Sequence, residues 1–253
     1  MAIISHRHKF IFIKTRKTAG SSIEIFLAGS VGPEDIMCPT GDGKKIGIVD
    51  QNNRKNIREL TFRDFSQFSR RFIKNMVKSG KPDFKRSFNK LHRVIKSSHA
   101  SASELKDICG EEIWNSYYKF CFERNPFDRL ISLYHWRSRN LKVKPHFKEF
   151  VSSIIEKHNK QQKKNKNSSF WSNRPFYEID EQIVVDKVCK FENLEQEMRD
   201  FYALKGMPWD GELPHMKGGF RPEKHYREYY DSELRRLCES AFSFEMENFG
   251  YRF

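Results

Sequence analysis

The chain changes from strand to helix within the stretch Phe10-Ile11-Phe12-Ile13-Lys14-Thr15-Arg16-Lys17-Thr18-Ala19-Gly20-Ser21-Ser22-Ile23-Glu24. Its first four residues are apolar and of types that favour strands. The middle is basic and rich in hydroxyl groups and holds one glycine, and apolar residues then return at helical spacing, at Ile23, Phe26 and Leu27. The stretch therefore predicts a strand, a short loop and the first turn of a helix.

This loop has the chemistry of an anion site. The first turn of a helix presents N–H groups without intrahelical partners and the positive end of the helix dipole. Lys17, Ser21 and Ser22 add side-chain donors, so we expect a phosphate-like group here. The loop of nucleoside triphosphatases, G-x-x-x-x-G-K-[ST], places its lysine after a second glycine. Because Lys17 precedes Gly20 and no earlier glycine exists, a magnesium–triphosphate site fits poorly.

A second change from strand to helix lies about a hundred residues later, in Phe120-Cys121-Phe122-Glu123-Arg124-Asn125-Pro126-Phe127-Asp128-Arg129-Leu130-Ile131-Ser132-Leu133-Tyr134. Pro126 suits a first helical turn. Arg124 is thus expected at the end of a strand, and Ser132 along the following helix. An arginine suits phosphate because its planar fork donates two charge-assisted hydrogen bonds. The alternative is that Arg124 and Arg129 are solvent-facing charges beside a helix cap.

A third segment lies between these two. Residues 92–99 are expected to form a strand, and Ser101 or Ser103 to cap a helix with apolar positions at Leu105, Ile108, Ile113 and Trp114. His99 then falls at the carboxyl end of a strand, and in open α/β sheets that edge carries the ligand site. A single histidine is more often structural or merely exposed, but this placement favours a functional role.

Together these segments resemble the microbial or viral branch of the carbohydrate-type sulfotransferases, sulfotransferase family 2. The loop from Arg16 to Ser22 is similar to the family's P-K-T-A-G-[ST]-[ST], with Arg16 where proline is usual. The run from Arg124 to Ser132 is similar to R-x-P-x-x-R-x-x-S, and Ser98 to Leu105 to S-H-A-[ST]-A-x-E-L. Further similar pieces lie near the C-terminus, at residues 191–194, 226–231 and 250–253. Only residues 38 to about 90 lack a counterpart.

The resemblance implies an α/β, P-loop-like three-layer fold with a central, mostly parallel sheet flanked by helices. It also implies transfer of a sulfuryl group from 3′-phosphoadenylyl sulfate (PAPS) to an acceptor hydroxyl, most simply on a carbohydrate, with adenosine 3′,5′-bisphosphate (PAP) as product and no metal. The implied catalytic residues are Lys17, for the leaving oxygen, and His99, as the base. The implied nucleotide-binding residues are Arg16, Lys17, Thr18, Ala19, Gly20, Ser21, Ser22, Arg124, Ser132, Lys217 and Arg221.

Two of these assignments leave alternatives open. Lys14 lies three residues before Lys17 and is an alternative for the lysine role, a second electrostatic donor or an exposed residue. Lys217 and Arg221 stand in a loop with two glycines that resembles the family's variable loop over the nucleotide. That loop is equally compatible with a simple linker.

Length, charge and composition set broader limits. We expect one domain over residues 1–253, because two nucleotide elements must meet at one sheet edge. A variable insert is expected at about 38–90 and an exposed basic loop at about 157–168. The net charge of +14 favours an anionic ligand or partner. A nucleic-acid-binding protein would also satisfy the charge, but no familiar nucleic-acid-binding motif is visible. A small-molecule kinase is the nearest enzymatic alternative.

Cysteine usage and hydropathy suggest a compartment. Five scattered cysteines without C-x-x-C spacing indicate reduced thiols rather than disulfides or zinc ligands. No apolar run approaches the ~20 residues of a membrane span, and the N-terminus lacks a signal-peptide pattern. These features favour a cytoplasmic enzyme. Animal Golgi members of the family that the chain resembles carry a signal anchor, so the resemblance implies a bacterial or viral origin.

Overall fold

The computed structural model describes residues 2–37, 51–53, 66, 68–70, 72–73, 94–95, 97, 99–162, 172–214, 222 and 224–253. Its main sheet has the strand order β3-β1-β2-β4-β7. The strands are β1 (Ala2–Ser5), β2 (Phe10–Ile13), β3 (Ile36–Met37), β4 (Tyr118–Glu123) and β7 (Lys187–Lys190). Since β1 is antiparallel to both neighbours while β2, β4 and β7 pair in parallel, four of the five strands run the same way.

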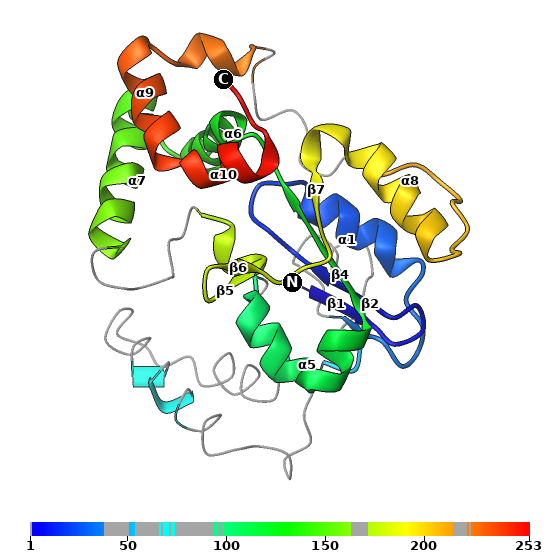
Figure 1. Ribbon diagram of the computed structural model, residues 1–253. Helices are drawn as coiled ribbons and strands as arrows, with labels where there is room; N and C mark the ends of the chain where they lie inside the picture. Colours follow the sequence, from blue (N-terminus) through cyan, green and yellow to red (C-terminus); the bar gives the residue numbers. More distant parts are fainter. Residues whose placement is uncertain are drawn as a thin grey trace.

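Helices flank this sheet. They are α1 (Gly20–Ala28), α5 (Ala102–Ser116), α6 (Pro126–Ser138), α7 (Phe147–Gln162), α8 (Leu194–Leu204), α9 (Ser232–Ala241) and α10 (Ser243–Phe249). Short elements complete the order, namely η2 (Arg174–Phe176), β5 (Glu178–Ile179), β6 (Gln182–Ile183), η3 (Phe191–Asn193) and η4 (Tyr226–Tyr229). In Figure 1, α6, α7, α9 and α10 gather beyond the end of β4, with α1 and α8 beside the strands. The predicted α/β architecture, with a central, mostly parallel sheet flanked by helices, is confirmed.

The central strands are apolar on both faces because both faces are covered. Phe10 and Phe120 face α8, where their rings lie 5.1 Å and 4.1 Å from the ring of Phe201. Residues of opposite parity in β4 face the other side. There the carboxylate of Glu123 accepts a hydrogen bond from the hydroxyl of buried Tyr177. Glu123 is thus a charged residue in the sheet interior, at the end of the strand that leads to Arg124.

A second apolar cluster holds α6 in place. Buried Phe127, in the first turn of α6, packs with residues of α7, α9 and the chain end, and its ring lies 4.8 Å from that of Phe253. The N-cap residue Asn125 accepts a hydrogen bond from the Phe127 N–H and donates one to the carbonyl of Arg252. Pro126 occupies the first helical turn, as predicted. The start of α6, directly after Arg124, is therefore fixed from two sides.

Two local predictions differ from the structure. The strand expected over 92–99 is absent from the described residues of that range, because the N–H groups of Val94 and Ile95 bond to Asn53 rather than to a strand. The basic loop expected from residue 157 begins inside α7, which runs to Gln162. Lysine and glutamine are good helix formers, so this run extends the helix. The rest of that loop, and most of the 38–90 insert, lie outside the described residues.

The described cysteines, Cys109, Cys121, Cys189 and Cys238, are free thiols, and Cys38 lies outside the described residues. Within the described ranges, no helix is both long enough and apolar enough to cross a membrane.

Candidate functional site

The loop between β2 and α1 has a strained backbone. Lys17 and Ala19 adopt positive φ angles of 64° and 55°, a conformation that costs side-chain-bearing residues of order 1–3 kcal/mol each. Ala19 is the N-cap residue of α1, and its methyl side chain cannot cap the helix. The N-terminus of α1 therefore has no side-chain cap from its own N-cap residue. Such an end is suited to an anion.

Gly20 is required for close approach rather than for an unusual φ angle. A Cβ atom at this position would lie 2.7 Å from Cγ and 2.8 Å from Cε of Lys14. The aliphatic stem of Lys14 thus lies against the first residue of α1, and any larger residue at position 20 would displace it.

Lys14 is buried in an ion pair. Its Nζ donates to Glu24 Oε2 at 2.9 Å and to Ser21 Oγ at 3.2 Å, and both charged side chains are almost fully buried. Of the alternatives for Lys14, exposure is therefore wrong. Lys17 lies elsewhere, with its Nζ 5.4 Å from the centroid of the Trp136 ring on α6. The two lysines therefore lie in different environments, and Lys14 is paired with the buried Glu24 carboxylate.

The threonines stabilise the loop itself. Thr15 and Thr18 share a hydroxyl–hydroxyl hydrogen bond of 2.7 Å, and Thr15 also donates to the carbonyl of Phe122 at the end of β4. Thr18 is buried. Its hydroxyl therefore helps to attach the loop to the neighbouring strand.

Arg124 joins the two predicted phosphate elements. Its Nη1 donates to the Lys17 carbonyl at 3.2 Å, and its Nε donates to Asp128 Oδ2 at 2.7 Å. Its guanidinium stacks on the ring of Phe191 at 4.1 Å. These contacts come from the loop, from α6 and from η3. The alternative that Arg124 is a solvent-facing charge is wrong, because its side chain is only 13% exposed.

Arg129 and Ser132 have different positions on α6. The alternative of a solvent-facing Arg129 is also wrong, because this side chain is buried between Glu123, at 3.7 Å, and Glu245, at 3.5 Å. Ser132 is partly buried, two turns along the helix from its start. Of the residues in the loose family pattern, Arg124 contacts the loop, whereas Arg129 lies in the interior between two carboxylates.

His99 lies at the start of the loop. Its Nδ1 is 3.0 Å from the carbonyl oxygen of Lys14. Because a carbonyl only accepts, Nδ1 carries the proton and Nε2 carries the lone pair. Burial lowers the pKa of His99 to about 3, and the positive charges of Arg16 and Lys14 contribute to the decrease. Since an unperturbed histidine has a pKa near 6.5, this shift favours the neutral imidazole.

The helix after His99 begins after Ser101, one of the two N-cap residues that the sequence predicted. Ser101 is the N-cap residue of α5, and its hydroxyl accepts from the N–H of Glu104 while Glu104 accepts from the N–H of Ser101. This capping box fixes the chain direction two residues after His99.

Sequence reasoning missed Asn173 and Glu123. Asn173 is fully buried and bonds to the backbone of Arg16 and to the Glu123 carboxylate. The Arg16 side chain contacts the carbonyl of Ser172 and the ring of Phe176. A polar residue 157 positions from the loop gives no local signal of this contact, although a glutamate ending an apolar strand is a signal of a buried polar network.

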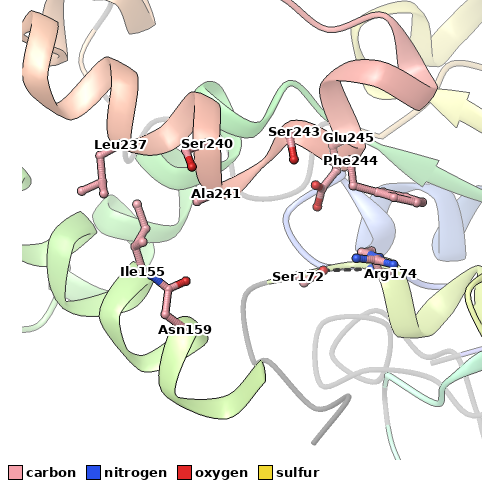
Figure 2. Close-up of a pocket in the computed structure, with 10 residues that line it drawn as sticks. All are labelled: Ile155, Asn159, Ser172, Arg174, Leu237, Ser240, Ala241, Ser243, Phe244 and Glu245. Atoms are coloured by element: carbon pink, nitrogen blue, oxygen red, sulfur yellow. Dashed lines mark hydrogen bonds between the residues drawn. The ribbon is translucent and has the colours of Figure 1, made fainter. Parts of the chain in front are cut away.

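A cavity of about 290 Å³ is lined in part by Ser172 and Arg174, the two chain neighbours of Asn173. Figure 2 shows Ser172 and Arg174 on one wall, with α7, α9 and the start of α10 opposite. None of the predicted site residues that the structure describes lines it. Two of them, Lys217 and Arg221, lie outside the described residues. Within the described residues, no group of three or more His, Cys, Asp or Glu side chains is arranged to hold a metal ion.

Comparisons with known proteins define the class. The model of the sulfotransferase family matches residues 1–252. The chain therefore belongs to the sulfotransferase family. A solved structure, described as a sulfotransferase from Alicyclobacillus acidocaldarius, is 18% identical over 98% of both chains, with a TM-score of 0.42. No curated protein matches the chain significantly.

Proposed function

We propose that the protein transfers a sulfuryl group from PAPS to an acceptor hydroxyl, with PAP as product. The hydrogen bond from Arg124 to the Lys17 carbonyl carries this proposal, because it brings the 5′ and 3′ phosphate elements to one sheet edge. One nucleotide with phosphates at both positions would fit such an arrangement. Membership of the sulfotransferase family supports the reaction class.

The donor would be held from both ends. The 5′-phosphosulfate would lie at the N-terminus of α1, where backbone N–H groups from Thr18 to Ser21 and the hydroxyls of Ser21 and Ser22 would bind its phosphate. Arg124 and Ser132 bind the 3′-phosphate, and Lys217 and Arg221 are candidates for further phosphate contacts. Arg16 contributes positive charge and holds the loop through its backbone.

Transfer would depend on positioning and charge stabilisation, as phosphoryl transfer does. Lys17 moves from its position over Trp136 to the bridging oxygen, where negative charge grows as the S–O bond breaks. His99 Nε2 takes the proton of the acceptor hydroxyl while that oxygen bonds to sulfur. The hydrogen bond from Nδ1 to the Lys14 carbonyl keeps this tautomer.

We propose a carbohydrate acceptor. Trp136 supports this choice, because it is 39% exposed and adjacent to the Lys17 amine. The Trp136 ring, which the Arg139 guanidinium also contacts at 4.7 Å, offers a large, rigid aromatic surface beside which a sugar ring can pack. The net charge of +14 would also favour an acidic glycan.

A transfer assay with labelled PAPS against glycans, lipids and small alcohols tests the reaction. We expect label on a glycan hydroxyl. Label on a lipid or small alcohol alone would contradict the carbohydrate acceptor but support sulfuryl transfer. Absence of PAP binding together with absence of transfer would overturn the function.

Replacement of Arg124 tests the donor. The protein should prefer PAP over adenosine 5′-phosphate, and Arg124→Ala should remove most of that preference. A lost charge-assisted contact costs roughly 1.5–3 kcal/mol, or one to two decades in affinity. Calorimetry on both nucleotides measures this. Equal affinity of the unaltered protein for the two would contradict the assignment.

A further inference from the structure

We infer that Asn173 is the positioning residue that sets the spacing between the 5′-phosphate loop and the 3′-phosphate strand end. The inference rests on the proposed function, since it concerns how this chain holds one nucleotide at two points. Asn173 lies in the segment that precedes η2, far from both elements in sequence.

The carboxamide of Asn173 forms a two-point contact with the loop. Its Oδ1 accepts from the Arg16 N–H at 2.9 Å, and its Nδ2 donates to the Arg16 carbonyl at 3.3 Å. Both the N–H and the carbonyl of Arg16 are thus hydrogen-bonded, as they would be beside a neighbouring β-strand. Arg16 directly precedes Lys17, whose φ angle of 64° requires support from outside the loop.

The same carboxamide bonds to the strand end. Nδ2 also donates to Glu123 Oε1 at 2.9 Å, and that oxygen accepts from the Arg124 N–H at 3.0 Å. The other carboxylate oxygen accepts from the Tyr177 hydroxyl at 3.2 Å. A continuous path of hydrogen bonds therefore runs from the Arg16 backbone through Asn173 and Glu123 to the Arg124 backbone.

The orientation of this amide is determined by its partners. A flipped carboxamide would place its NH₂ group against the Arg16 N–H and its oxygen against the Glu123 carboxylate. Asn173 is fully buried, so water cannot replace a lost partner. The path consequently has one favourable arrangement.

The departure at position 16 makes the contact possible. Proline, the residue usual there in the pattern the loop resembles, has no N–H to donate. The Arg16 side chain adds a hydrogen bond to the Ser172 carbonyl at 3.3 Å and a contact with the Phe176 ring at 4.8 Å. In this chain the segment with Asn173 holds the loop through hydrogen bonds that a proline-containing loop would lack.

The test distinguishes a change in the spacing of the two phosphate elements from a general loss of protein stability. A ligand that contacts both elements depends on their spacing, whereas a ligand that contacts only the loop does not. We expect Asn173→Ala to weaken PAP binding by about 10- to 100-fold and adenosine 5′-phosphate binding much less. Calorimetry on the two nucleotides gives this ratio without any acceptor.

Matched variants complete the design. Asn53→Ala removes another buried asparagine that accepts from a backbone N–H, that of Ile95, and should leave the nucleotide preference unchanged. If Asn173→Ala does not fold, Asn173→Ser, which stays polar but is too short to reach Arg16 and Glu123 together, should reduce the preference.

The outcomes distinguish the inference from the proposed function. If the unaltered protein lacks a preference for PAP, the proposed function fails. If it has the preference, and folded Asn173→Ala or Asn173→Ser retains it in full, the inference fails while the function stands. Loss of the preference in Asn53→Ala to the same extent would also overturn it, because the effect would then follow from stability alone.

Discussion

His99 is neutral in the ligand-free protein, and its low pKa has two consequences. The folded protein resists protonation of this imidazole, whereas the unfolded chain takes up the proton below a pH of about 6.5. The His99 contribution to stability is therefore present above pH 6.5 and is lost progressively as the pH falls toward 3. A base with such a low pKa is also weak until its surroundings change.

We predict that nucleotide binding raises the pKa of His99. The phosphates of PAP add negative charge close to Arg16 and Lys14, and thereby offset the positive charges that lower this pKa. Nuclear magnetic resonance of the imidazole, assigned with His99→Gln, measures it as a function of pH with and without PAP. We expect titration near pH 3 without PAP and a clearly higher midpoint with it. Titration near 6.5 in the free protein would contradict the burial of His99.

At the scale of elements, β2 and α1 are joined by the buried pair of Lys14 and Glu24. The strand, loop and helix were predictable, because their periodicities change from strand to helix within fifteen residues. The ion pair was not, because lysine and glutamate are usually exposed at such positions. The signal that could have indicated it is the spacing of Glu24 four residues after Gly20, which places both on one face of the helix.

We predict that replacing Lys14 mainly lowers stability, whereas replacing Lys17 mainly lowers turnover. Lys14→Met leaves the Glu24 carboxylate buried without its partner and should cost about 3–5 kcal/mol of unfolding free energy, whereas Lys14→Met with Glu24→Leu should recover most of it. Lys17→Met should change stability little and reduce turnover strongly. Thermal unfolding and a transfer assay measure the two effects. A stable Lys14→Met protein without turnover would move the catalytic role to Lys14.

At the scale of the whole molecule, the site is assembled from distant segments. The sequence predicted that the loop, Arg124 and His99 share one sheet edge, and the hydrogen bonds of Arg124 and His99 to the loop backbone confirm their proximity. The contribution of Asn173 could not be predicted, because a side-chain-to-backbone contact between residues 157 positions apart leaves no periodic pattern in the sequence. For the same reason, the buried role of Arg129 follows only from the packing of α6 against α10.

We predict that donor binding and turnover persist in excess chelator. In the proposed site, Lys17 and Arg124 supply the positive charge that magnesium supplies in kinases. PAP affinity should be the same with and without chelator, and so should the rate of sulfuryl transfer. Strict dependence on added magnesium would favour a phosphotransferase.

The parallel pairing of β2 with β4 also has a consequence for synthesis of the chain. Ile13 pairs beside Cys121, so the central pair of strands cannot form until more than a hundred residues have been made. Asn173 is added later still. A nascent chain arrested before residue 118 could form the β1–β2 hairpin and α1, but its loop would lack the strand beside it. Contacts of such long range are costly in loop entropy and slow to form. The ability to bind PAP should thus appear abruptly and late during translation, which makes it a reporter of completed folding on the ribosome.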